Sequence, residues 1–123
     1  MLCLWLLSGC SNIQPVESFN NQPIPSGLSN TDIENAIRTA GVANHWTITV
    51  ENPNLIRGDL YWKKYYVHVD IPHDKHSYSI FYRNSKNLNY KNGEIRSGYN
   101  KWVTILNHSI QEQLSVVQNN RSK

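Results

Sequence analysis

Four residues in the middle of the chain carry side chains that can bind metal ions or move protons. They are His68, Asp70, His73 and His76. His68 and Asp70 are two positions apart, so in an extended strand they lie on one face. Imidazole and carboxylate ligands of this kind suit zinc, nickel or copper. Their spacing matches no helical or finger motif, however, and we expect neither a metal nor another cofactor at these residues.

Other catalytic signatures are missing from the chain. It contains no Gly-x-Ser-x-Gly elbow, no phosphate-binding loop and no His-Glu-x-x-His pair. We therefore expect a protein that is not an enzyme. The alternative is a small hydrolase or a metal-handling protein that uses His68, Asp70, His73 and His76.

A second reactive side chain is the thiol of Cys10. It closes an apolar run that begins at Met1, and the four residues Leu7-Ser8-Gly9-Cys10 resemble the lipobox at which bacterial lipoprotein precursors are acylated and cleaved. The resemblance implies a lipid on Cys10 and removal of residues 1–9 as a signal peptide. No Lys or Arg precedes Cys10, so we expect the signal peptide to be truncated here. The apolar run is too short to span a bilayer.

The same resemblance predicts where the protein is found. Ser11 follows the cysteine, where an Asp would favour retention in the inner membrane. We therefore expect an outer-membrane lipoprotein whose domain faces the periplasm, with the cell surface as the alternative. The net charge of +3 comes from dispersed Lys and Arg residues, with no run longer than Lys63-Lys64. This distribution does not fit nucleic acid, which requires a basic stripe.

These side chains must be positioned by the domain that follows. Residues 10–29 contain many Asn, Gln, Pro and Ser residues without periodicity, and they indicate a flexible tether after the lipidated Cys10. Residues 30–123 have a length that suits one domain with a modest core. The predicted organisation is thus a signal peptide over 1–9, a tether over 10–29 and a single domain over 30–123.

Within that domain, hydrophobic periodicity predicts six elements. Thr31 and Glu34 form a capping box at the start of a helix that Gly41 ends. Alternating apolar residues then predict four strands, and an apolar stripe from about Tyr99 predicts a second helix. The expected strands are 46–51, 56–62, 65–71 and 78–82. The order α-β-β-β-β-α predicts an α+β fold, a two-layer sandwich in which both helices cover one face of a four-stranded antiparallel meander.

One face of such a sheet stays open to solvent. If Trp62, Val67 and Ile80 point toward the helices, the alternation places a set of aromatic and charged side chains on the open face. The candidate binding face consists of Arg57, Tyr61, Tyr66, Phe81 and Arg83. Tyr and Arg often anchor interfaces, and aromatic platforms suit sugar rings. The alternative is that the aromatic side chains only stiffen the sheet by cross-strand pairing. Trp46 and Trp102 are expected in the core.

The fourth strand and second helix carry a further resemblance. The segments concerned are Tyr78-Ser79-Ile80-Phe81-Tyr82, Ser85, Asn87-Leu88-Asn89-Tyr90, Gly93, Ile95 and Tyr99-Asn100-Lys101-Trp102-Val103. Together with the lipobox, they resemble an uncharacterised family of small proteobacterial lipoproteins. That family implies a signal peptide, a tether and a domain, but it supplies no catalytic residues. We therefore expect a non-catalytic binding or assembly module, attached to the membrane through Cys10, with an envelope protein or cell-wall glycan as partner.

Overall fold

The computed structural model of the chain describes residues 12–121, so Cys10 and the residues before it lie outside the described part. Seven strands and two helices make up that part of the chain. They are β1 (Ile13–Pro15), β2 (Phe19–Pro23), α2 (Asn30–Ala43), β3 (Trp46–Asn52), β4 (Leu55–Trp62), β5 (Tyr65–Pro72), β6 (Ser77–Lys86), β7 (Glu94–Arg96) and α3 (Ser97–Arg121).

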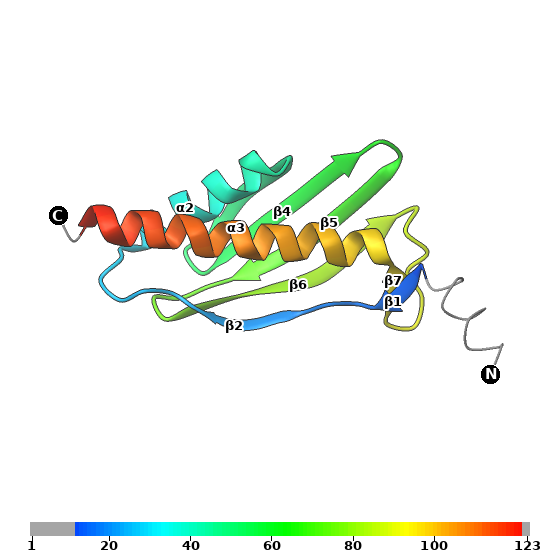
Figure 1. Ribbon diagram of the computed structural model, residues 1–123, viewed down its shortest axis with the longest axis horizontal. Coiled ribbons are helices and arrows are strands. Elements are labelled where there is room, and N and C mark those ends of the chain that lie inside the picture. Colours follow the sequence, from blue (N-terminus) through cyan, green and yellow to red (C-terminus); the bar gives the residue numbers. More distant parts are fainter. Residues whose placement is uncertain (1–11, 122–123) are drawn as a thin grey trace.

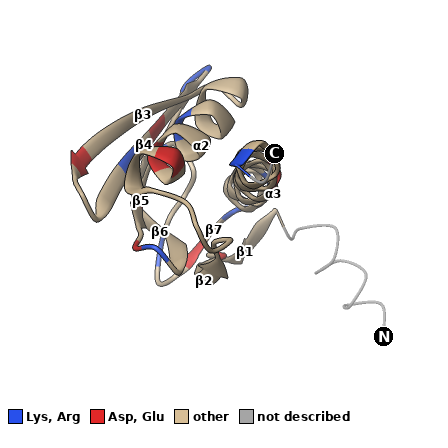
Figure 2. Cartoon of the chain, turned by 90° about the vertical axis from the view of Figure 1, so that its left-hand side faces the viewer, with Lys and Arg blue, Asp and Glu red and all other residues tan. Residues whose placement is uncertain are grey.

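The main sheet is antiparallel and has five strands in the order β2-β6-β5-β4-β3. Figure 2 looks along the long axis of the molecule and shows α2 and α3 on the same side of this sheet. The predicted α+β class and the four consecutive strands β3 to β6 are therefore confirmed. The predicted number of strands is wrong, because β2 adds a fifth strand beside β6, and β1 pairs with β7 in a separate two-stranded sheet.

The predicted flexible tether is also wrong for the described residues of the segment 10–29. Two of the seven strands lie in it, and Ile24 and Leu28 are among the buried core residues. The amide of Ile24 donates to the carbonyl of His76 at 2.9 Å. The sequence shows no periodicity here because the strand β2 is short, has an irregular register beside β6 and depends on a partner far along the chain.

The N-cap of the first helix lies two residues before Thr31, the predicted one. Ser29 is its N-cap, and the Ser29 side chain accepts from the Asp32 amide while Asp32 accepts from the Ser29 amide, both at 3.0 Å. The helix also continues past Gly41 to Ala43. Gly41 is needed for packing instead of termination, because a Cβ atom there would lie 2.5 Å from Ile48 Cδ1.

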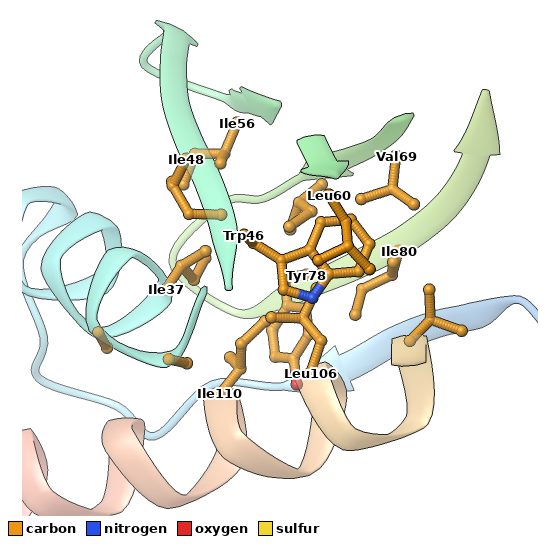
Figure 3. Close-up of a cluster of buried hydrophobic side chains, with 14 of the residues drawn as sticks. Ile37, Trp46, Ile48, Ile56, Leu60, Val69, Tyr78, Ile80, Leu106 and Ile110 are labelled. Atoms are coloured by element: carbon orange, nitrogen blue, oxygen red, sulfur yellow. The ribbon is translucent and has the colours of Figure 1, made fainter. Parts of the chain in front are cut away.

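The core lies between the sheet and the two helices (Figure 3). Ile37, Trp46, Ile56 and Leu106 are almost fully buried in it. The apolar stripe predicted for the second helix is confirmed, since its members Tyr99, Val103, Leu106, Ile110 and Leu114 are buried on α3. Two tryptophans, Trp62 and Trp102, are less buried than predicted.

Trp62 was expected to point into the core but is 46% exposed, because it lies at the end of β4, where its ring has the tilted His45 ring 6.0 Å away between centroids and the Lys63 ammonium as neighbours. Trp102 is only partly buried against the core, and the centroid of its ring lies 5.9 Å from that of the Tyr65 ring.

The long axis of the molecule runs along the strands and α3 (Figure 1). At one end lie β1, β7, the start of α3 and the turn between β4 and β5. At the other end lie the turn between β5 and β6 and the end of α3. There Arg121, at the end of α3, joins the two helices by donating to Asp32 of α2, with Nε 3.1 Å from Oδ2.

Candidate functional site

The candidate site is the open face, which we define as the side of the main sheet opposite the helices. Alternation along β4 and β5 brings side chains to this face in opposed pairs, in which Arg57 faces Asp70, Asp59 faces His68, and Tyr61 faces Tyr66. The core face of the same strands holds Ile56, Leu60, Val67 and Ile71, all buried. The sequence therefore places polar side chains outward because every second position is needed for the core.

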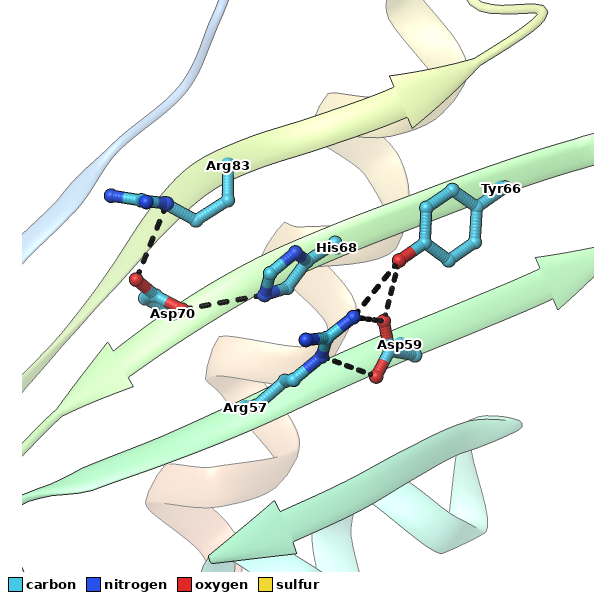
Figure 4. Close-up of polar contacts among 6 residues, drawn as sticks. All are labelled: Arg57, Asp59, Tyr66, His68, Asp70 and Arg83. Carbon is cyan, nitrogen blue, oxygen red and sulfur yellow. Dashed lines mark hydrogen bonds and ion pairs between the residues drawn. The ribbon is translucent and has the colours of Figure 1, made fainter. Parts of the chain in front are cut away.

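One polar cluster on this face joins β4 to β5 (Figure 4). Arg57 Nε donates to Asp59 Oδ2 at 2.9 Å, and the Tyr66 hydroxyl donates to Asp59 Oδ1 at 2.7 Å. Partial burial works to raise the pKa of Asp59, but the hydrogen bonds from Arg57 and Tyr66 outweigh it and lower that pKa. Burial and the bond to Asp59 raise the pKa of Tyr66. Asp59 is thus a carboxylate held by two donors.

A second cluster contains His68, Asp70 and Arg83 (Figure 4). His68 Nε2 and Arg83 Nε each lie 3.4 Å from an oxygen of Asp70. The His68 contact is not aligned as a hydrogen bond, and within the described part of the chain His68 Nε2 has no hydrogen-bond partner. Arg83 reaches this face through an irregularity in β6, where the register with β5 passes from Tyr82 to Asn84 and leaves Arg83 without an opposite residue.

Aromatic side chains complete the open face. The Tyr61 and Tyr66 rings lie 4.8 Å apart, and the Lys86 ammonium lies 5.9 Å from the Tyr66 ring. Tyr61 is 68% exposed and Phe81 is 37% exposed. Phe81 borders an open groove of about 430 Å³, and the other side chains in this groove are mainly polar. They include Asn21, Asn54, Asp74, Ser77 and Ser79.

All five residues of the predicted binding face lie on the open face. Alternation along the strands had assigned all five of them to this face. It did not reveal the ion pairs and hydrogen bonds that fix these side chains, and it missed Lys86, whose place over Tyr66 depends on the register of β6. The groups on this face are engaged with one another and form a preassembled surface of rings, charges and hydrogen-bonding atoms.

The four residues of the alternative site do not come together. Only His68 and Asp70 are neighbours on the open face. His73 is 4% exposed, while His76 is exposed in the turn before β6. Among residues 12–121, no three His, Cys, Asp or Glu side chains are close enough to share a metal ion.

Comparison of the chain with protein-family models, with curated proteins and with solved structures finds no match. No helix in the described part of the chain is long and apolar enough to cross a membrane.

Proposed function

We propose that this protein is a bacterial cell-envelope lipoprotein with a non-catalytic binding or assembly role. Acylated Cys10 anchors it to the outer membrane, with the domain on the periplasmic side. The sequence Leu7-Ser8-Gly9-Cys10 supports the anchor. Its binding surface is the open face, through Arg57, Tyr61, Tyr66, Phe81 and Arg83, and the partner is an envelope protein or a cell-wall glycan.

One observation carries the binding role. The open face presents exposed rings next to charged groups that are already fixed by their neighbours, as in the Arg57, Asp59 and Tyr66 cluster. A surface fixed before binding loses little side-chain freedom when a partner arrives. Exposed aromatic groups bordered by charge tend to mark interaction sites. No specific observation favours the hydrolase or metal-handling alternative.

Crosslinking in intact cells tests the binding role. The test variant is Tyr61→Ser with Phe81→Ser, because both rings are exposed and their loss leaves the core unchanged. The matched control is Val42→Ser with Val116→Ser, which removes two exposed apolar side chains from the helices. We expect the test variant, but not the control, to lose the crosslinked partner found by mass spectrometry, or to lose binding to purified cell-wall glycan. Equal recovery from both variants would contradict the proposed face.

The anchor has a separate test. Cys10→Ser removes the sulfur that the lipid requires, so we expect an unprocessed or soluble protein after fractionation at high salt, which screens electrostatic binding to lipid. Unchanged membrane association of a correctly cleaved Cys10→Ser protein at high salt would show that the anchor is wrong.

A further inference from the structure

The chain enters the folded domain immediately after the proposed lipid attachment site. The carbonyl of Asn12 accepts a hydrogen bond from the Ser97 amide at 2.6 Å, so residue 12 is already fixed to the start of α3. Asn12 also borders a hollow of about 250 Å³ together with Tyr65 and Trp102. Two residues of chain span at most about 7 Å. A lipid on Cys10 would therefore hold this end of the domain directly against the head groups.

The same end of the molecule is strongly basic. We call it the basic end and define it by the side chains of the β4–β5 turn, the end of β6, the following loop, β7 and the start of α3 (Figure 1). Its basic residues are Lys63, Lys64, Lys86, Lys91, Arg96 and Lys101. These are six of the 12 Lys and Arg residues in the chain, whereas only two of the nine Asp and Glu residues, Glu17 and Glu94, accompany them. The net charge of the basic end thus exceeds that of the whole chain.

Aromatic rings accompany these lysines. The Lys63 ammonium lies 5.8 Å from the Trp62 ring, and the Lys64 ammonium lies 5.7 Å from the Tyr65 ring. Trp62 and Tyr90 are each nearly half exposed. Tyr and Trp side chains are enriched where proteins meet the interface between head groups and acyl chains, and Lys is attracted to anionic head groups.

We propose that the basic end docks on an anionic phospholipid surface and fixes the orientation of the domain. The orientation rests on the anchor proposed above, because Cys10 brings this end, and no other, to the bilayer. At a physiological Debye length of about 8 Å, charges held this close to the head groups remain largely unscreened. The strands and α3 then extend away from the membrane. The open face lies on the side of the molecule, not at its docked end, and is accessible to a partner.

Vesicle binding by the full chain tests the docking surface independently of acylation. The protein carries Cys10→Ser, and it is sedimented with vesicles of phosphatidylglycerol or of phosphatidylcholine at low and high salt. We expect binding to phosphatidylglycerol that weakens with salt and exceeds binding to phosphatidylcholine. Any affinity of residues 1–11 is common to all variants and cancels in the comparison.

The decisive comparison is between lysines in two turns at opposite ends. Lys64→Gln removes one exposed charge from the basic end, and Lys75→Gln removes one from the exposed turn between β5 and β6. One lysine near the surface changes binding by about fivefold. We expect this loss for Lys64→Gln, a loss of more than tenfold for Lys63→Gln with Lys64→Gln, and little change for Lys75→Gln.

Equal effects of Lys64→Gln and Lys75→Gln would overturn the proposal, as would equal binding to the two lipids. Unchanged melting temperatures verify that the variants are folded. If vesicle binding behaves as expected while cleaved Cys10→Ser protein stays in the membrane fraction of cells after a high-salt wash, docking is correct and the anchor is wrong. If vesicle binding does not behave as expected while Cys10→Ser is released from the membrane fraction, docking is wrong and the anchor is retained.

Discussion

Tyr66 links the two central strands of the open face through a single hydroxyl group. It donates to Asp59 at 2.7 Å, and hydrogen bonds to charged groups typically contribute about 1.5 to 3 kcal/mol. The site is only partly buried, so we expect Tyr66→Phe to lower the free energy of unfolding by about 1 kcal/mol. Tyr61→Phe is the control, because Tyr61 is mostly exposed and its hydroxyl makes no hydrogen bond to the residues that the structure describes. Denaturant unfolding compares them, and equal effects would mean that the Asp59 bond does not stabilise the sheet.

His73 makes the stability of the folded domain depend on pH. It is almost fully buried, and neither ring nitrogen has a hydrogen-bond partner among residues 12–121. Burial lowers the pKa of His73 below its ordinary value of 6.5, although Glu34 and Asp74 oppose this shift. The unfolded chain therefore binds a proton more readily than the folded chain, and stability falls as pH decreases below about 6.5.

We expect His73→Leu to remove this acid sensitivity. The variant should melt at a higher temperature than the parent at pH 5, with a smaller difference at pH 8. His76→Gln, in the exposed turn nearby, is the control and should leave the pH dependence unchanged. A parent and a His73→Leu variant with parallel pH profiles would show that His73 does not titrate as we infer.

At the scale of elements, we make opposite predictions for the two glycines that lie in helices, Gly41 in α2 and Gly98 in α3. Replacing Gly by Ala within a helix normally stabilises by about 0.5 to 1 kcal/mol. At Gly98 an added Cβ would make ordinary contacts 3.6 Å from the Trp102 ring, so we expect Gly98→Ala to stabilise. At Gly41 it would collide with Ile48, and overpacking costs about 1 to 3 kcal/mol. Gly41→Ala should therefore destabilise, and stabilisation by both changes would contradict the close packing of α2 on β3.

The elements also show which parts of the fold local sequence determines. Strands β3 to β6 and the stripe of α3 were predictable because their apolar periodicity matches a face that is buried in the structure. The start of α2 was not, because Ser29 with Asp32 and Thr31 with Glu34 both have capping-box spacing. Long-range contacts favour the earlier start: Leu28 is buried, and Asn30 donates to the Pro53 carbonyl at 3.0 Å.

The site was predictable in the same partial way. Arg57, Tyr61 and Tyr66 follow from alternation along strands whose opposite residues are apolar. Arg83 was also assigned to the open face, but the irregularity that leaves it unopposed in β6 is set by the register with β5. The failure at Trp62 has another cause: its strand position faces inward, but the helical layer does not cover the end of β4.

At the scale of the whole molecule, one ion pair connects the first helix to the end of the last. Hydrogen bonds from Arg121 and Ser29 lower the pKa of Asp32 to about 2, from an ordinary value of 3.8. The folded state therefore holds the charged carboxylate more strongly than the unfolded chain does. The resulting stability is present above about pH 4 and is lost as pH falls toward 2.

Arg121→Gln removes the largest cause of this shift. We expect the variant to melt below the parent at pH 7, and we expect the difference in melting temperature to shrink as pH falls from 4 toward 2, because protonation of Asp32 in the parent then weakens the ion pair. Lys75→Gln is a charge-matched control without an ion pair to Asp32. A difference between Arg121→Gln and the parent that persists unchanged at pH 2 would assign the effect to packing of the α3 terminus.

The position of β1 and β2 directly after the proposed anchor at Cys10 has a mechanical consequence. A pull on Cys10 would load β1 first, and β1 pairs with β7 through only three residue pairs; β2, at the edge of the main sheet, would be loaded next. Peeling both strands from the sheet would release residues 13–28, on the order of 50 Å of extended chain. Strands β3 to β6 would keep their mutual pairing.

We expect force spectroscopy on residue 12 to show this short extension before the domain unfolds, whereas unfolding in one step would mean that the edge is as strong as the core. A domain held close to the membrane at rest would thus move farther from it when a pull from a bound partner is strong enough to peel β1 and β2 from their sheets.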